Sequence, residues 1–156
     1  MKEKKGIFNS LLERIEIICN SQIEKLVKIY KICELLKKKV SYYDWVGLYL
    51  VDKSKKDELI LSQFFGEPTK YVRIPFGQGI CGQVAEKKET CIIQDVTKET
   101  NYLSCSVKVK SEIVVPIFKN GIVIGEIDID SHSISPFTQE DNKFLKNVSD
   151  LVAKLM

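Results

Sequence analysis

Three acidic residues alternate with isoleucine in the sequence GEIDIDS, near the end of the chain. On a β-strand, side chains two positions apart point to the same face, so Glu126, Asp128 and Asp130 would form a row opposite Ile127 and Ile129. A row of like charges costs free energy unless a positive group lies over it. The row therefore indicates either a site for a small cation, such as an amino acid's ammonium, or a strand whose Glu126 and one aspartate face solvent.

Cysteines are the second group of residues that could carry chemistry. Cys81 lies in IPFGQGICG, where a strand turns into a helix, and a helix N-terminus favours the thiolate of a nearby cysteine. The alternative is that the glycines only turn the chain and Cys81 packs inward. Cys105 lies in the loop NYLSCSVKVKSE, where Lys108 and Lys110 would lower its pKa if they are also close in space. Both are candidate redox thiols.

The remaining candidates have simpler explanations. Cys19 and Cys33 fall in or beside apolar helical stripes, and Cys91 occupies a place where a strand core residue is expected. We expect the single histidine, His132, to be a surface loop residue. No paired CxxC or HxxxH spacing occurs, so the sequence predicts no metal site. Neither GxGxxG nor GxxxxGK[ST] is present, which argues against a phosphate-binding loop.

Composition excludes several classes of protein. The chain has 156 residues, 44% of them hydrophobic, which predicts a single domain over residues 1–156 with its own core. The 24 Lys plus Arg against 21 Asp plus Glu give a net charge of +3, and two arginines are too few to favour nucleic-acid binding. No apolar run approaches the ~18 residues that span a membrane, and the N-terminus does not resemble a signal peptide. We therefore expect a cytoplasmic protein with reduced thiols.

Helices are predicted at both ends of the chain. Apolar residues recur at helical spacing over residues 7–40, with a break near Asn20, after which Ser21 and Glu24 could form a capping box. A final helix is predicted within residues 138–156, capped by Thr138 and Asp141. A short helix is expected over residues 79–87.

Between these ends the spacing changes to two, which predicts strands. We expect them at residues 44–51, 58–65, 71–76, 90–94, 112–118 and 122–130. Asn120-Gly121 is a strong hairpin signal, and Pro116 indicates an edge or bulge position. The predicted architecture is α+β: N-terminal helices at 1–40, a sheet with a pocket at 42–134, and a C-terminal helix at 138–156.

Five motifs, taken in order, resemble the GAF-domain free methionine-(R)-sulfoxide reductases. They are DWVGLYL, VRIPFGQGICG, IIQDV, SEIVVPI and GEIDIDS, and the resemblance runs from about Tyr42 to the final helix. It implies a GAF fold with a central six-stranded antiparallel sheet, N- and C-terminal helices on one side and a small ligand pocket on the other. It also implies reduction of free L-methionine-(R)-sulfoxide, with thioredoxin as the usual dithiol reductant, no bound cofactor, and a homodimer.

Residue roles follow from the same resemblance. The catalytic cysteines match Cys105 and Cys81, with Cys105 as the nucleophile and Cys81 as the resolving thiol, although exchanged roles stay open. The substrate-binding residues match Glu112, Asp128, Asp130, Trp45 and Tyr49. One position departs from the family, because Tyr71 replaces a third cysteine. That departure keeps open an alternative, a noncatalytic GAF domain that binds a small amino-acid-like or nucleotide ligand.

Overall fold

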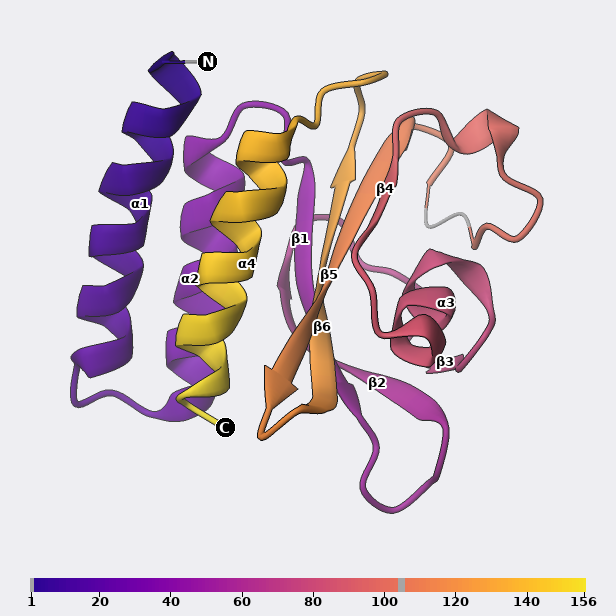
Figure 1. Ribbon diagram of the computed structural model, residues 1–156, viewed down its shortest axis with the longest axis horizontal. Helices are drawn as coiled ribbons and strands as arrows, with labels where there is room; N and C mark the ends of the chain where they lie inside the picture. Colours follow the sequence, from indigo (N-terminus) through magenta and orange to yellow (C-terminus); the bar gives the residue numbers. More distant parts are fainter. Residues whose placement is uncertain (1, 104–105) are drawn as a thin grey trace.

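The computed structural model describes residues 2–103 and 106–156, and within them it has the α+β architecture expected from the sequence (Figure 1). Cys105 lies outside the described residues. In chain order the elements are α1 (Lys2–Asn20), α2 (Lys25–Lys39), β1 (Trp45–Val51), β2 (Glu58–Phe65), β3 (Arg73–Pro75), α3 (Gly79–Lys87), β4 (Cys91–Ile93), the 3₁₀ helix η1 (Val96–Lys98), β5 (Ser111–Lys119), β6 (Ile122–Ser131) and α4 (Gln139–Ala153).

The strands form one antiparallel, six-stranded sheet in the order β3-β2-β1-β6-β5-β4, which confirms the predicted sheet. The predicted hairpin joins β5 to β6. Its turn residues Asn120 and Gly121 both have positive φ, 53° and 77°, the conformation that a two-residue hairpin turn requires. The acidic strand β6 therefore lies between β1 and β5, near the middle of the sheet.

Pro116 occupies an edge position, as its residue type predicts. It pairs with Glu126 of β6 on one side, whereas β4 on the other side pairs with β5 only as far as Val114. The β5–β6 register also shifts between Ile117 and Phe118. Since proline has no N–H to donate, it fits where the strand has lost its second neighbour.

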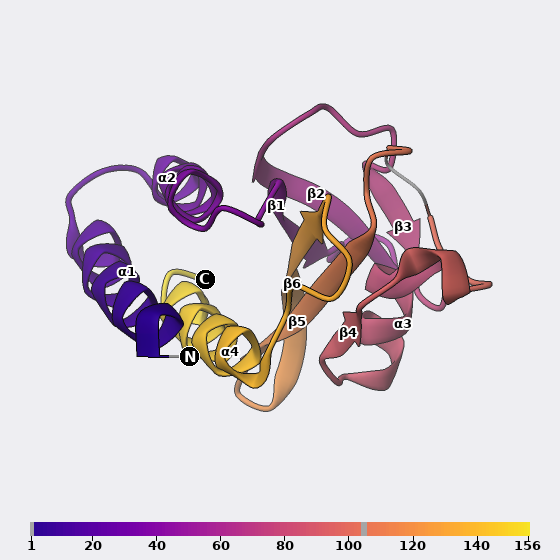
Figure 2. The same ribbon diagram turned by 90° about the horizontal axis from the view of Figure 1, so that it is seen from above.

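Helices cover the two faces of the sheet unequally. Helices α1, α2 and α4 lie on one face and α3 on the other (Figure 2). Ile127 and Ile129 of β6 face the three-helix side and pack in the larger apolar core, where Phe8 of α1 also stacks on Phe144 of α4 with ring centroids 4.2 Å apart. The acidic side chains of β6 therefore face the side that α3 covers.

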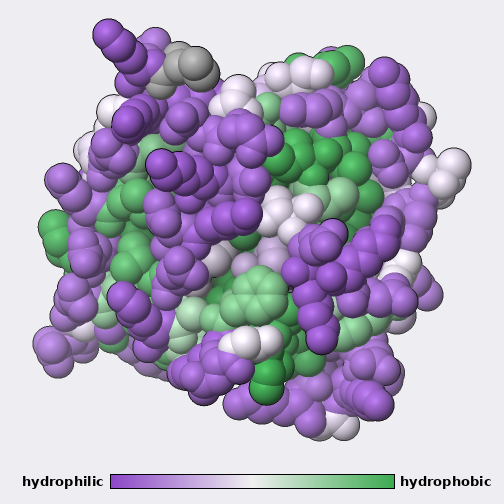
Figure 3. All heavy atoms as spheres, in the orientation of Figure 1, coloured by the Kyte–Doolittle hydropathy of each residue, from purple (hydrophilic) through white to green (hydrophobic). Residues whose placement is uncertain are grey.

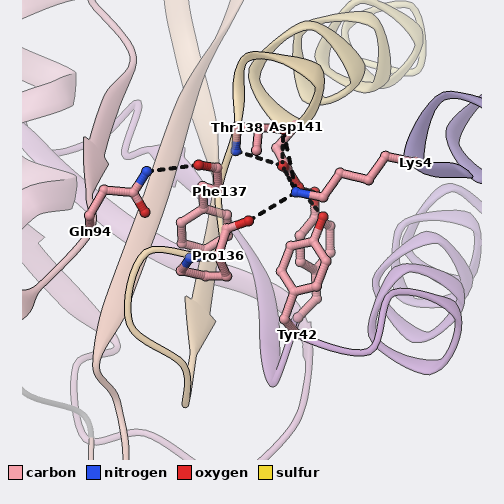
Figure 4. A network of polar contacts seen from close by, with 8 residues as sticks. Lys4, Tyr42, Gln94, Pro136, Phe137, Thr138 and Asp141 are labelled. Atoms are coloured by element: carbon pink, nitrogen blue, oxygen red, sulfur yellow. Dashed lines mark hydrogen bonds and ion pairs between the residues drawn. The ribbon is translucent and has the colours of Figure 1, made fainter. Parts of the chain in front are cut away.

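Several polar contacts meet at Asp141 in the first turn of α4. Thr138 and Asp141 form the predicted capping box. The Asp141 carboxylate, fully buried, also accepts hydrogen bonds from Lys4 Nζ at 2.8 Å, Tyr42 Oη at 2.6 Å and Tyr43 Oη at 2.8 Å (Figure 4). This one side chain thus connects α1, the segment before β1, and α4.

The predicted capping box at the start of the second helix is wrong. The Ser21 hydroxyl donates to the Ile18 carbonyl at 2.6 Å, so it closes the end of α1. Helix α2 instead begins at Lys25 with Glu24 at its N-cap, and no side chain caps it. None of the helices in the described chain is both long enough and apolar enough to cross a membrane.

Candidate functional site

The acidic row lies buried on the face of the sheet under α3. Residues directly opposite each other in antiparallel strands share a face, so the register of β6 with its neighbours identifies what surrounds the row. Asp130 lies between Trp45 and Glu112, and Asp128 lies between Gly47 and Val114.

Glu126, the third member of the row, lies between Tyr49 and Pro116. Glu126, Asp128 and Asp130 are 0%, 3% and 2% exposed. The alternative in which Glu126 and one aspartate face solvent is therefore wrong.

Cys81 projects from the first turn of α3 toward this row. Its Sγ lies 3.9 Å from Glu112 Oε1, and the Cys81 sulfur, a Glu112 oxygen and an Asp128 oxygen all lie within 4.8 Å of one another. The glycines around Cys81 allow this approach. Gly79 has a φ of +63°, and a Cβ on Gly82 would lie 2.6 Å from the Pro75 carbonyl oxygen.

Asn101 holds the turn before α3 in place. Its side-chain oxygen accepts from the Gly79 backbone N–H at 2.9 Å, and its Nδ2 donates to the Gly77 carbonyl at 2.8 Å. Asn101 belongs to the loop between η1 and β5, the same loop that contains Cys105 in the sequence. The contact therefore ties that loop to the helix that carries Cys81.

Electrostatics favour the neutral thiol at Cys81 over the thiolate that a helix dipole alone would favour. Burial raises the pKa of Cys81 well above its usual value, and the carboxyl groups of Asp128, Glu126 and Glu112 raise it further. Three nearby acidic groups and the loss of water outweigh one helix terminus. Cys81 is consequently a protonated, poorly nucleophilic thiol in this structure.

The carboxyl groups also hold their protons more tightly than usual. Burial raises the pKa of Asp128 to about 6, and it raises the pKa values of Glu126 and Asp130 well above their ordinary range. No lysine or arginine of the described chain is among the groups that shift these three values. The site is thus a source of protons and lacks the positive group that the acidic row requires.

Two small neighbouring cavities divide the predicted substrate-binding residues between them. Tyr49, Glu112 and Asp128 line the first together with Cys81, Tyr71 and Leu103, and its volume is about 10 Å³. Trp45 and Asp130 line the second, which measures about 30 Å³. A water molecule is the largest guest that about 10 Å³ admits. The first cavity is therefore too narrow for an amino acid, which can enter only if the cavity walls move.

The two predicted aromatic residues are held by hydrogen bonds to the backbone. The Trp45 indole N–H donates to the Glu67 carbonyl at 2.9 Å, and its ring stacks on Phe64 at 5.6 Å. The ring also lies over Gly47, where a Cβ would approach it to 2.2 Å. The Tyr49 hydroxyl donates to the Tyr71 carbonyl at 2.6 Å. Tyr71, the position at which the sequence was expected to depart from the family, is part of the wall of the first cavity.

The other candidate residues divide between the two sides of the sheet: Cys19 and Cys33 belong to the larger core, whereas Cys91 packs against the cluster around Cys81 and His132 lines the second cavity. Cys33 is buried in the larger core, Cys19 packs against that core, and Cys91 is half-buried in β4. His132 is exposed, as expected, and its backbone N–H donates to Asp44 Oδ2 at 2.7 Å.

A larger groove of about 530 Å³ lies elsewhere, between α4 and the segment from α3 to β4. Lys88, Pro116 and Lys146 are among its lining residues, and no cysteine is. In the view of Figure 3, hydrophilic side chains cover much of the surface. No thiol lines this groove, so among the described residues the cysteine that lies close to carboxyl groups is the one in the smaller cavity.

Glu126 belongs to the acidic row predicted from the sequence, but it is not among the substrate-binding residues that the resemblance implies. The signal was present in the sequence, because Glu126 stands two positions before Asp128 on the same strand. Its full burial depends on α3 and could not be read from that spacing.

Comparison with known proteins adds a second line of information. The GAF domain family model matches residues 28–156. The free methionine-R-sulfoxide reductase of Saccharomyces cerevisiae is 34% identical over 156 residues, covering 97% of this chain and 86% of that protein. The Escherichia coli protein of the same name is 36% identical over 78% of this chain and 69% of its own length.

A solved structure agrees with these sequence matches. The free methionine-R-sulfoxide reductase of Neisseria meningitidis, in complex with its substrate, superposes with a TM-score of 0.90 at 34% identity, covering 97% of this chain and 89% of that one.

Proposed function

Because the chain belongs to the GAF domain family, and within it to the free methionine-R-sulfoxide reductases, we propose that it reduces free L-methionine-(R)-sulfoxide to L-methionine. The observation that carries the proposal is a buried thiol, Cys81, within 4.8 Å of the carboxyl groups of Glu112 and Asp128. A thiol supplies electrons, and the carboxyl groups supply a proton and a partner for an ammonium.

The proposed reaction has two thiol steps. In the first, the thiolate of Cys105 attacks the sulfoxide sulfur while a carboxylic acid protonates the sulfoxide oxygen. The resulting hydroxyl passes from the methionine sulfur to the Cys105 sulfur, so that the sulfoxide S–O bond breaks, methionine leaves and Cys105 becomes a sulfenic acid. In the second, the Cys81 thiol condenses with that sulfenic acid, forming a disulfide and releasing water. Together the two thiols are oxidised by two electrons and the sulfoxide is reduced by two.

Cys81 is better suited to the second step than to the first. Its raised pKa leaves it protonated near neutral pH, whereas the initial attack needs a thiolate. This supports Cys105 as the nucleophile and Cys81 as the resolving thiol. The exchanged assignment would require the substrate's own ammonium to lower the Cys81 pKa on binding.

The carboxyl groups take two roles in this proposal. Asp128, with a pKa of about 6, changes its protonation state near neutral pH and is the candidate proton donor to the departing oxygen. Those of Glu112, Asp128 and Asp130 that are ionised pair with the ammonium of the substrate. Trp45 contributes a cation–π contact and Tyr49 forms part of the wall.

Regeneration of the thiols completes the proposed cycle. An external dithiol such as thioredoxin reduces the Cys81–Cys105 disulfide by exchange, and no bound cofactor takes part. Because Tyr71 replaces the third family cysteine, the disulfide cannot move to that position before reduction. We further propose that the protein acts in the cytoplasm as a homodimer.

The proposal is tested by following the loss of free methionine-(R)-sulfoxide driven by dithiothreitol, with the (S) epimer as the control substrate. Wild type should consume only the (R) epimer, Cys105→Ser should lose at least about 1000-fold in rate, and Cys91→Ser should match wild type. Failure of the well-folded wild type to turn over either epimer would falsify the reductase proposal.

One observation favours a second candidate, a GAF domain that binds an amino-acid-like or nucleotide ligand without chemistry. The described thiol, Cys81, is protonated, and Tyr71 removes a cysteine that family members use. Under this alternative a ligand would bind without turnover, and neither Cys81 nor Cys105 would affect its affinity.

A further inference from the structure

Glu126 is a buried acid to which the proposed reaction assigns no role. It is 0% exposed, and among the described residues neither of its carboxyl oxygens meets a hydrogen-bond partner of ordinary geometry. Burying an ionised carboxylate in this way costs several kcal/mol or more, so the side chain is stable there only as the neutral acid.

None of the described groups that face Glu126 supplies a positive charge to stabilise its ionised form. Asp128 lies beside it on β6, and Tyr49 opposes it from β1 with a hydroxyl that donates to the Tyr71 carbonyl. Cys81 faces it from α3, and Glu112 of β5 lies close to that same sulfur. All of these groups are neutral or acidic.

Cys81 faces Glu126 across the gap between sheet and helix. Among the described groups, the thiol is the hydrogen-bonding group that acts on the pKa of Glu126, and it only partly offsets the rise that burial causes. A thiol is a weak donor, which fits the lack of an ordinary hydrogen bond at the carboxyl oxygens.

We propose that Glu126 is a neutral carboxylic acid that positions the Cys81 sulfur for its attack on the oxidised second cysteine. When Cys81 attacks the sulfenic acid, the sulfur–sulfur bond forms, the sulfenic S–O bond breaks, and the thiol proton leaves with the hydroxyl as water. The acid O–H of Glu126 can donate to the sulfur as its proton departs. Glu126 is thus a positioning residue, and its assignment to the resolving step rests on the proposed reductase function.

Infrared spectroscopy tests the protonation state without any turnover. The difference spectrum between wild type and Glu126→Gln at pH 7 should contain a protonated carboxyl C=O band that wild type has and the variant lacks. Glu89→Gln, at an exposed position, is the matched control and should lose a carboxylate band instead. A carboxylate band lost from Glu126→Gln would overturn the proposal.

A second readout measures the thiol itself. The rate at which iodoacetamide alkylates Cys81, followed by peptide mass spectrometry, should have the same pH midpoint in wild type and Glu126→Gln, because a neutral amide replaces a neutral acid. Cys91 in the same sample is the internal control. A midpoint lowered by about one unit or more would mean that the variant had removed a negative charge, and the proposal would be wrong.

The last readout separates positioning from substrate binding. Glu126→Leu should lower kcat about tenfold with little change in KM, and dimedone should trap more sulfenic acid on Cys105, while Glu126→Gln should stay near wild type. Equal losses in both variants would contradict the positioning role. If wild type shows no reductase activity, the proposed function fails, and the infrared and alkylation results still decide the state of Glu126.

Discussion

Asp128 illustrates how burial changes a single acidic side chain in this protein. Its pKa is raised to about 6, and the cause is desolvation, because hydrogen bonds to Glu112 and Cys81 act in the opposite direction. A carboxyl group whose pKa is higher in the folded than in the unfolded protein stabilises the fold while it is protonated. That stabilisation is lost as the pH rises through about 6.

We therefore expect wild type to be less stable at pH 8 than at pH 5, and Asp128→Asn to reduce that difference. The part due to Asp128 is about 1.4 kcal/mol, because pH 5 lies about one unit below the folded pKa of about 6. Urea unfolding of both proteins at the two pH values measures it. Asp150→Asn, at an exposed position on α4, should leave the difference unchanged, and an equally small effect of Asp128→Asn would contradict the explanation.

At the scale of elements, one carboxylate organises the contacts among the helices. Asp141 caps α4 and also accepts from Lys4 of α1 and from Tyr42 and Tyr43 before β1. These contacts bring three separate segments to the same point of the three-helix face. The sequence predicted only the cap, because the other donors are 98 to 137 positions away in the chain.

Removing this carboxylate should cost more than a lost cap. We expect Asp141→Ala to lower the free energy of unfolding by about 3–5 kcal/mol, because it leaves buried donors unsatisfied, whereas loss of an N-cap alone costs about 1 kcal/mol. Denaturant unfolding followed by circular dichroism gives the value. Glu140→Ala, one residue earlier on α4, is the control, and a cost near 1 kcal/mol for Asp141→Ala would mean that only the cap matters.

At the scale of the whole molecule, the sheet separates an apolar core from a site where no described lysine or arginine acts on the buried acids. Apolar residues fill the space under α1, α2 and α4, while the opposite face holds buried acids beside cavities of about 10 and 30 Å³. A ligand that supplies an ammonium would complete the site. Its binding must also move the wall, in which Leu103 packs against Gly79.

Ligand binding should therefore raise the stability of the whole fold. Free methionine-(R)-sulfoxide at 100 times its Kd should add about 2.7 kcal/mol, and this should appear as a higher Tm in a Cys105→Ser variant that cannot turn it over. The matched control is the same sulfoxide acid without its amino group, which should give little shift. An equal shift from both compounds would show that the acids do not bind the ammonium.

Several features of this protein could be read from the sequence because each depends on local spacing. The alternation in GEIDIDS predicts three acids on one face, Asn120-Gly121 predicts the hairpin, and Thr138 with Asp141 predicts the cap of α4. The motifs around Cys81 predict the family. In each case the physical cause acts over a few neighbouring residues.

Only the tertiary structure decided how those residues behave. Packing of α3 on the sheet buries the row, brings Cys81 to 3.9 Å from Glu112, and favours the neutral form of the Cys81 thiol. The same packing adds Glu126 to the site. Desolvation and the proximity of charges depend on contacts between segments far apart in the chain, so residue spacing determines which groups share a face, and tertiary packing determines their protonation and reactivity.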